Sequence, residues 1–147
     1  MDRKAKAQWR GDLRSGTGTI SSGSGVLSST PYSFRDRFEQ GTGTNPEELL
    51  AAAHAACFSM ALSAELAKER LKADSIETTC AITLEKQGDG FAISHSHLEL
   101  TAKIPGASED AFNRATQSAK ENCPVSKLYD TEITLDARLE QSTASGA

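Results

Sequence analysis

The sequence predicts an α+β domain: a mainly antiparallel sheet with a long central helix and a second helix gathered on one of its faces. Three observations predict this class. Strand-like segments open the chain, an apolar segment with helical spacing begins near residue 46, and two strictly alternating segments then flank a tight turn. A second helical pattern and a last alternating segment follow, and no internal repeat is visible.

The first forty residues are rich in Gly, Ser and Thr and alternate only in part. Turn residues at short intervals are typical of short strands in a meander, so we expect strands at 6–14 and 17–24. The segment PYSFRDRFE, residues 31–39, then carries Arg35 and Arg37. We interpret it as a loop or a short strand.

The residues from 45 to 48 carry several signals that are typical of the N-terminus of a helix. Asn45 can cap a helix, Pro46 suits its first position, and Glu47 and Glu48 place negative charge at its positive end. Asn45 and Glu48 also have the spacing of a capping box. The sequence therefore predicts a long helix from 46 to about 71.

Apolar residues recur along this helix at steps of three and four. They are Leu50, Ala53, Cys57, Met60, Ala64, Ala67 and Leu71. This spacing predicts one buried side of the helix, and it places Cys57 on that side.

The segment SIETTCAITLEK, residues 75–86, alternates strictly and predicts a half-buried strand. A Gly-Asp-Gly turn at 88–90 and the return segment 91–104 complete a hairpin. Cys80 shares the apolar side of the first strand. We therefore interpret it as an inert thiol in the core.

The last third of the chain predicts a helix at 109–121, capped by Ser108. Its inward side is formed by Phe112, Ala115 and Ala119. A short helical segment VSKLY at 125–129 and a strand at 133–139 follow. One domain over 1–140 is expected, with 141–147 as a frayed tail.

Composition narrows the class of function. The formal net charge is −4, and no cluster of Lys and Arg is present, so nucleic-acid binding is not expected. The N-terminus lacks the apolar core of a signal peptide, and we find no apolar stretch of the roughly 20 residues that span a bilayer. We expect a cytoplasmic protein that does not bind membranes. Three cysteines in such a chain indicate a metal site, a catalytic thiol or packing.

A metal site is the weakest of these three interpretations. His95 and His97 share one side of a strand, and His54 precedes Cys57 by three residues on a helix. No C-x-x-C pair or completing carboxylate accompanies them, so we favour solvent-facing strand histidines and a helix histidine near a partner surface. A nucleophile and base pair of Cys57 and His54 stays open.

Local physics favours Cys123 over Cys57 as the reactive thiol. Cys123 precedes Pro124 and can lie at a helix N-terminus, where the dipole favours the thiolate. Cys57 lies in mid-helix, where apolar surroundings raise the pKa of a thiol. A cation could reverse this order, and Arg37 is the candidate. At about 4 Å a guanidinium is worth at most about 4 kcal/mol at an effective dielectric of about 20, or about three pKa units.

Four segments resemble the osmotically inducible protein (OsmC) family, which is related to the organic hydroperoxide resistance (Ohr) proteins. They are PYSFRDRFE, GTNPEELLAAAHAACFSMALS, GFAIS and CPVSKLYDTEITLD. The resemblance implies a thiol-dependent peroxidase on an intertwined homodimer, with no metal and no bound cofactor. It implies Cys57 as the peroxidatic cysteine, Cys123 as the resolving cysteine and Arg37 as the activating arginine. Glu47 is implied as the carboxylate that pairs with this arginine, with the adjacent Glu48 as the alternative.

The resemblance also implies a reaction. Organic hydroperoxides, and hydrogen peroxide more weakly, would be reduced through a Cys57 sulfenic acid and a Cys57–Cys123 disulfide. A reducing dithiol or a lipoylated protein would then reopen the disulfide. Two other interpretations stay open: a non-catalytic dimeric stress or small-molecule-binding protein on the same fold, and a Cys/His metal module. Because ten helical residues separate Glu47 from Cys57, we expect each active site to combine both subunits.

Overall fold

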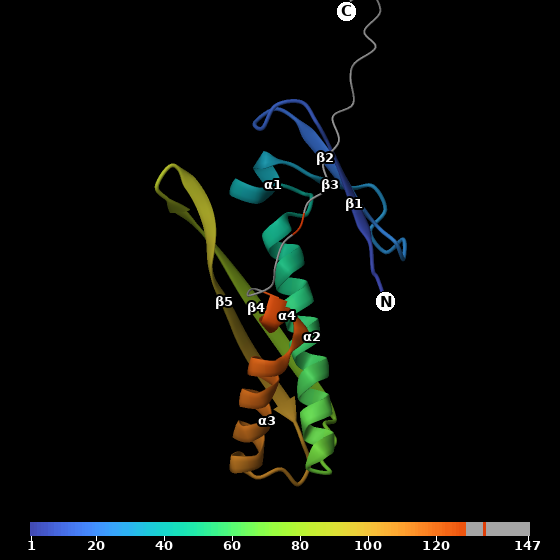
Figure 1. Ribbon diagram of the computed structural model, residues 1–147, viewed down its shortest axis with the longest axis vertical. Helices are drawn as coiled ribbons and strands as arrows, with labels where there is room; N and C mark the ends of the chain where they lie inside the picture. Colours follow the sequence, from blue (N-terminus) through green and yellow to red (C-terminus); the bar gives the residue numbers. More distant parts are fainter. Residues whose placement is uncertain (129–133, 135–147) are drawn as a thin grey trace, which may run out of the picture.

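The computed structural model describes residues 1–128 and residue 134 (Figure 1). Its elements, in chain order, are β1 (Ala5–Arg10), β2 (Thr17–Ser22), β3 (Thr30–Tyr32), α1 (Phe34–Phe38), α2 (Pro46–Lys68), β4 (Ser75–Gln87), β5 (Gly90–Lys103), α3 (Glu109–Asn122) and α4 (Pro124–Leu128). The predicted α+β class is confirmed. The strands form two antiparallel sheets, ordered β1-β2-β3 and β4-β5. The predicted strand 133–139 and tail 141–147 lie outside the described residues, apart from Thr134.

The β1-β2-β3 sheet contains the predicted strands with shorter bounds. β1 ends at Arg10 because Asp12 closes a turn: its Oδ1 accepts hydrogen bonds from the Ser15 N–H at 2.7 Å and the Ser15 hydroxyl at 2.6 Å. Gly11 precedes this turn with φ +97°, a conformation that favours glycine. The chain then returns as β2 in antiparallel register with β1.

The interpretation of 31–39 as a loop or short strand was wrong in its second half, where the chain forms the short helix α1. The Ser33 hydroxyl accepts a hydrogen bond from the Asp36 N–H at 3.2 Å and donates to the Asp36 carboxylate at 2.9 Å. The other Asp36 carboxylate oxygen accepts from the Gly43 N–H. Ser33 therefore caps a helix that carries Arg37.

Helix α2 begins where the sequence predicts. The Asn45 Oδ1 accepts a hydrogen bond from the Glu48 N–H at 2.7 Å, and Pro46 occupies the first turn. The capping box is only half formed, since the Glu48 carboxylate accepts from the Thr44 hydroxyl at 2.7 Å. The helix ends at Lys68, three residues before the predicted end.

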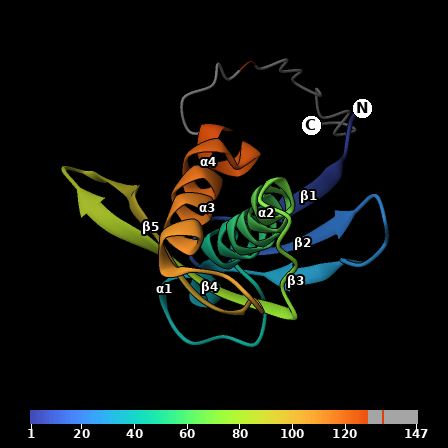
Figure 2. The same cartoon turned by 90° about the horizontal axis from the view of Figure 1, so that it is seen from below.

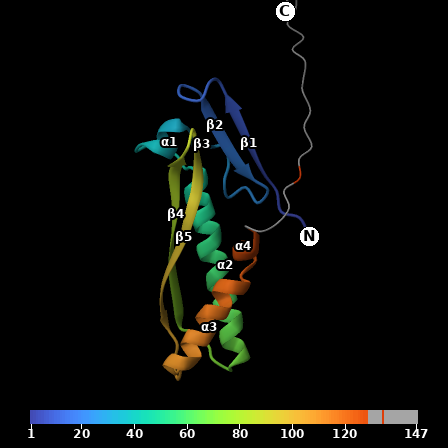
Figure 3. The same ribbon diagram turned by 60° about the vertical axis from the view of Figure 1, so that its left-hand side comes forward.

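The core lies between α2, α3 and the β4-β5 hairpin, which flank α2 (Figures 2 and 3). Its fully buried residues are Phe58, Leu62, Leu66, Ala115 and Ala119. The predicted buried side of α2 was therefore wrong in large part, because Met60 is 75% exposed and Ala53, Ala64 and Ala67 are also exposed. Small apolar residues occur on nearly all sides of this helix, so they do not mark one buried side. The bulky apolar side chains decide which side packs against the core.

Helix α2 leaves an apolar side uncovered in the single chain. Its exposed residues include Ala52, Ala53, Ala56, Met60, Ala64 and Ala67, which we call the alanine face. By length and mean hydropathy of 1.5 the helix could cross a membrane, which the sequence prediction overlooked. On the other side of the helix, Phe58, Leu62 and Leu66 pack in the core of the protein.

The β4-β5 hairpin and α3 agree closely with the prediction. Gln87 pairs with Gly90, and Gly88 has φ +58° in the turn between them. The Ser108 hydroxyl caps α3 by accepting from the Ala111 N–H at 3.1 Å. Ala111 rather than Phe112 joins Ala115 and Ala119 on its buried side. The chain then turns at Cys123 into α4 (Figure 1).

Candidate functional site

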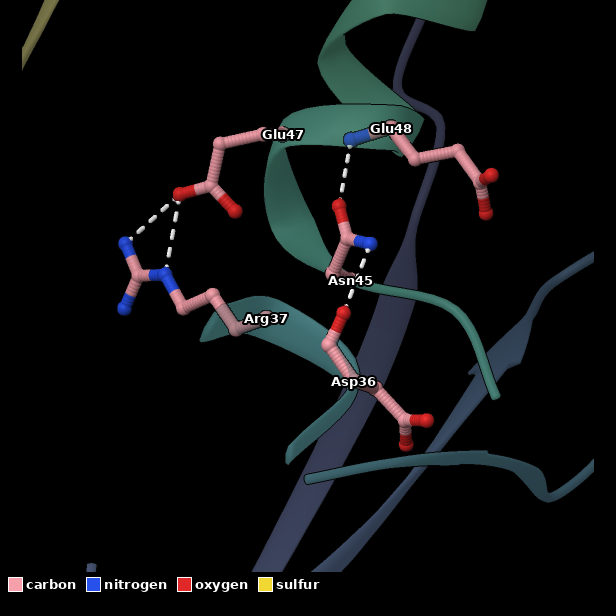
Figure 4. Close-up of polar contacts among 5 residues, drawn as sticks. All are labelled: Asp36, Arg37, Asn45, Glu47 and Glu48. Carbon is pink, nitrogen blue, oxygen red and sulfur yellow. Dashed lines mark hydrogen bonds and ion pairs between the residues drawn. The ribbon is translucent and has the colours of Figure 1, made fainter. Parts of the chain in front are cut away.

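Arg37 and Glu47 form an ion pair within one chain (Figure 4). The Arg37 Nη2 lies 2.7 Å from the Glu47 Oε1, and the Arg37 Nε donates to the same oxygen at 2.9 Å. Glu47 is 9% exposed, and its Oε2 is buried without a hydrogen-bond partner in the described structure. Glu48 points away toward Thr44. Of the two adjacent carboxylates, Glu47 is the one that meets the arginine.

The helix cap of α2 also holds this pair in place. The Asn45 side chain accepts from Glu48 through its oxygen, and its Nδ2 donates to the Asp36 carbonyl at 3.0 Å. One side chain therefore ties α1 to the start of α2, as Figure 4 shows. Because Arg37 follows Asp36 in α1, this bond fixes the arginine beside Glu47.

The two cysteines named by the resemblance meet at a second place in the fold. Cys57 is partly buried in the middle of α2, and Cys123 is fully buried where α3 passes into α4. The two thiols are near enough that each shifts the pKa of the other. The structure thus brings together two residues that are 66 positions apart in the sequence (123 − 57).

The two thiols have opposite pKa shifts. Burial raises the pKa of Cys57, and the hydrogen bond that its thiol makes to Cys123 raises it further. Burial alone would also raise the pKa of Cys123, but hydrogen bonds from the Ser126 N–H, the Cys57 thiol and the Ser126 hydroxyl outweigh it and lower the pKa. Within one chain, the surroundings therefore favour the ionised form of Cys123 and disfavour that of Cys57.

The arginine and the cysteines of one chain do not meet. Glu47 and Cys57 lie ten residues apart on the unbroken helix α2, which separates them by about 15 Å along its axis. Among the described residues, the groups that shift the pKa of Cys57 come from the region of Cys123 and Val125, and Arg37 is not one of them. The four predicted residues therefore lie in two separate pairs in the single chain.

His54 lies in a network that sequence analysis did not predict. It is 5% exposed, with its Nδ1 2.7 Å from the Ser96 hydroxyl and its Nε2 2.9 Å from the Ser126 hydroxyl. This histidine is therefore buried within the single chain, and its predicted place near a partner surface stays a prediction. His95 and His97 are exposed, as expected. No sequence signal marked the two serines, because they come from β5 and α4 and meet His54 only in the fold.

Cys80 has more polar neighbours than a core thiol. It lies on the side of β4 that faces α2 and is only partly buried, with its Sγ 3.3 Å from the Ser96 hydroxyl and 4.0 Å from the His54 Nδ1. The expectation of purely apolar packing was therefore wrong. Within residues 1–128 and 134, no three His, Cys, Asp or Glu side chains gather in a way that could hold a metal ion.

Comparison with known proteins identifies the family. The sequence profile of the family described as OsmC-like protein matches residues 39–138. This range includes Glu47, Cys57 and Cys123. The chain belongs to this family. Among OsmC-like relatives, the peroxiredoxin OsmC of Escherichia coli K12 is 48% identical over 140 residues, covering 95% of this chain and 98% of the relative. The organic hydroperoxide resistance protein OhrB of Bacillus subtilis is 32% identical over 124 residues, covering 84% and 88% of the two chains.

Solved structures support the OsmC-like fold independently. The crystal structure of Bacillus subtilis OhrB superposes with a TM-score of 0.63 at 30% identity, covering 86% of this chain and 90% of that one. An OsmC-like protein of unknown function from Vibrio cholerae gives 0.70 at 19% identity, with 90% and 96% covered, and this likeness shows the fold alone. The predicted family and its α+β fold are confirmed, while the predicted dimer stays a prediction.

Proposed function

We propose that this OsmC-like protein is a thiol-dependent peroxidase that reduces organic hydroperoxides and, more weakly, hydrogen peroxide. A relative that is 48% identical over nearly the full length carries the name peroxiredoxin, which supports the enzyme class. The observation that carries the proposal is that the Cys57 and Cys123 thiols are near enough for each to shift the pKa of the other. Two thiols that are neighbours in the fold are candidates for a disulfide.

The proposed reaction has three steps. The Cys57 thiolate attacks the O–O bond of the hydroperoxide, the alcohol leaves, and Cys57 becomes a sulfenic acid. The Cys123 sulfur then attacks the Cys57 sulfur and releases the hydroxyl oxygen as water, leaving a disulfide. A reducing dithiol, such as a lipoylated protein, restores both thiols by exchange. We place this cycle in the cytoplasm, where such dithiols stay reduced.

The raised pKa of Cys57 requires an activating cation, and we propose that the partner subunit of a homodimer supplies it. In a two-fold dimer an antiparallel copy of α2 brings the start of one helix to the middle of the other. Arg37 and Glu47 of one chain would then approach Cys57 of the second. The alanine face supports this packing, since small side chains allow two helices to lie close together. The unpartnered Glu47 Oε2 also fits a half-site that is incomplete in one chain.

The test is consumption of cumene hydroperoxide by the reduced protein, followed by stopped flow in wild type, Cys57→Ser and Cys80→Ser. Wild type and Cys80→Ser should consume peroxide at similar rates, and Cys57→Ser should not react. A Cys57→Ser variant as fast as wild type would contradict the proposal. A wild type without activity would favour the non-catalytic binding protein that the sequence left open.

A further inference from the structure

A line of neighbouring polar groups leads from the thiol pair to the buried histidine. The Cys57 and Cys123 thiols are close enough to shift each other's pKa, and the Ser126 hydroxyl is close enough to Cys123 to lower the pKa of that thiol. The same Ser126 hydroxyl lies 2.9 Å from the His54 Nε2. These residues come from α2, the α3–α4 junction and α4.

We propose that Ser126 and His54 take up the proton that Cys123 loses when it closes the disulfide, with Ser126 touching the reacting sulfur and His54 acting through Ser126 as a positioning residue. This inference rests on the proposed function and assigns residues to its second step. If the His54 Nδ1 carries the hydrogen and donates it to Ser96, the Nε2 can accept from Ser126. Ser126 can then accept from the Cys123 thiol, and once the proton has passed to His54 the Ser126 hydroxyl donates to the Cys123 thiolate, which is the form whose stabilisation lowers the Cys123 pKa.

The step balances in atoms and charge. Cys123 forms the S–S bond to Cys57, the S–O bond of the sulfenic acid breaks, and the leaving hydroxide takes one proton from solvent to become water. The Cys123 proton moves to the Ser126 oxygen while the Ser126 proton moves to the His54 Nε2. His54 then returns one proton to solvent, so the net products are the disulfide and one water. No further oxidant or reductant is needed.

His54 is suited to a transient role as proton acceptor. Burial lowers its pKa, so the ring is neutral near pH 7 and its Nε2 can accept a hydrogen bond. A cavity of about 890 Å³ is lined by both His54 and Ser126 and gives the proton a route to solvent. The other titratable groups that face His54 or line this cavity are Cys80 on β4, His95 and His97 on β5, and Lys120 on α3.

The experiment isolates disulfide formation from peroxide attack. Reduced protein is mixed with one equivalent of cumene hydroperoxide and quenched at intervals. Dimedone traps the sulfenic acid, alkylation marks the remaining thiols, and intact mass gives the amount of each form. The variants are Ser126→Ala, which removes the hydroxyl, and His54→Gln, which keeps hydrogen-bonding groups but cannot take up a proton. Ser94→Ala is the matched control, because Ser94 lines the same cavity outside this line of contacts.

We expect Ser126→Ala and His54→Gln to form the disulfide about 100-fold more slowly than wild type at pH 7, the lower end of what a general base contributes. Sulfenic acid should accumulate in both, and Ser94→Ala should behave as wild type. The defect should shrink above pH 9, where solvent has already ionised Cys123. Wild-type rates in Ser126→Ala, or a defect of equal size at all pH values, would overturn the inference. Failure of the proposed function is distinct, since wild type would then consume no peroxide.

Discussion

Arg37 and Glu47 of one chain are joined by an ion pair of 2.7 Å, yet Cys57 lies ten residues beyond Glu47 on the same straight helix. The proposed activating cation is thus firmly held, but away from the thiol of its own chain. This separation is the reason that the proposed active site requires two subunits.

Removal of Cys123 should separate the two steps of the cycle. Cys123→Ser should still reduce one equivalent of cumene hydroperoxide, because the attacking thiol is intact, and excess peroxide should then convert Cys57 to sulfinic acid. Mass spectrometry of the Cys57 peptide measures this product. Wild type under the same conditions should instead protect Cys57 as a disulfide. Loss of the first oxidation in Cys123→Ser would remove the assignment of the two roles.

Removal of Arg37 should raise the pKa of Cys57 in the assembled protein and slow peroxide attack by at least about tenfold, since one pKa unit lowers the thiolate fraction tenfold at a pH below the pKa. The rate of Cys57 alkylation against pH measures the thiol pKa in wild type and Arg37→Ala. Arg35→Ala is the matched control, because Arg35 lies on the same short helix and is exposed. An unchanged pKa in Arg37→Ala would show that another group activates the thiol.

Mixed dimers should reveal which chain supplies the carboxylate. Inactive Cys57→Ser chains and inactive Glu47→Ala chains are combined under conditions of subunit exchange. If each site combines two chains, a heterodimer contains one site with both residues intact, and a random equal mixture should regain about a quarter of wild-type activity. No recovery despite proven heterodimers would place the carboxylate and cysteine of one site in the same chain.

The stability of the protein should fall as the pH is lowered through the titration of His54. Burial holds the pKa of folded His54 below its ordinary value of 6.5. Between these two values the unfolded chain takes up a proton that the folded chain does not, so the unfolded state gains stability as the pH falls. Chemical denaturation from pH 7.5 to 5 at one protein concentration measures this slope. His54→Gln should reduce it, while His95→Gln should not, because His95 is exposed.

The sequence predicted most of the fold because its local signals agree with the tertiary structure. Asn45, Pro46 and Ser108 begin helices where they were expected, and the Gly88 turn joins the hairpin. The buried side of α2 was missed because Ala and Met surround that helix, so periodicity alone could not show which side packs. The α1 helix was missed because a five-residue helix has no periodicity, although Ser33 and Asp36 carried a capping signal.

The candidate site could be predicted from the sequence only in part, because some of its residues meet only in the tertiary structure. The spacing of Glu47 and Cys57 along one helix predicts that they lie far apart. Local reasoning singled out Cys123 and Arg37, and the family resemblance supplied the roles of all four residues and the choice of Cys57 as the attacking thiol. Ser126 and Ser96 could not be found in this way, because ordinary serines on β5 and α4 acquire meaning only when the fold places them against His54.

The alanine face of α2 leads us to expect that folding depends on protein concentration. A single chain exposes one side of a helix whose hydropathy is that of a membrane span, and water is a poor solvent for it. If a second copy covers that side, dilution removes activity and stability together, because the dissociated chain loses its active-site cation and its apolar cover at once. The midpoint of thermal unfolding should then rise with protein concentration, and a newly made chain would need a copy of itself, or a chaperone, before it is safe from aggregation.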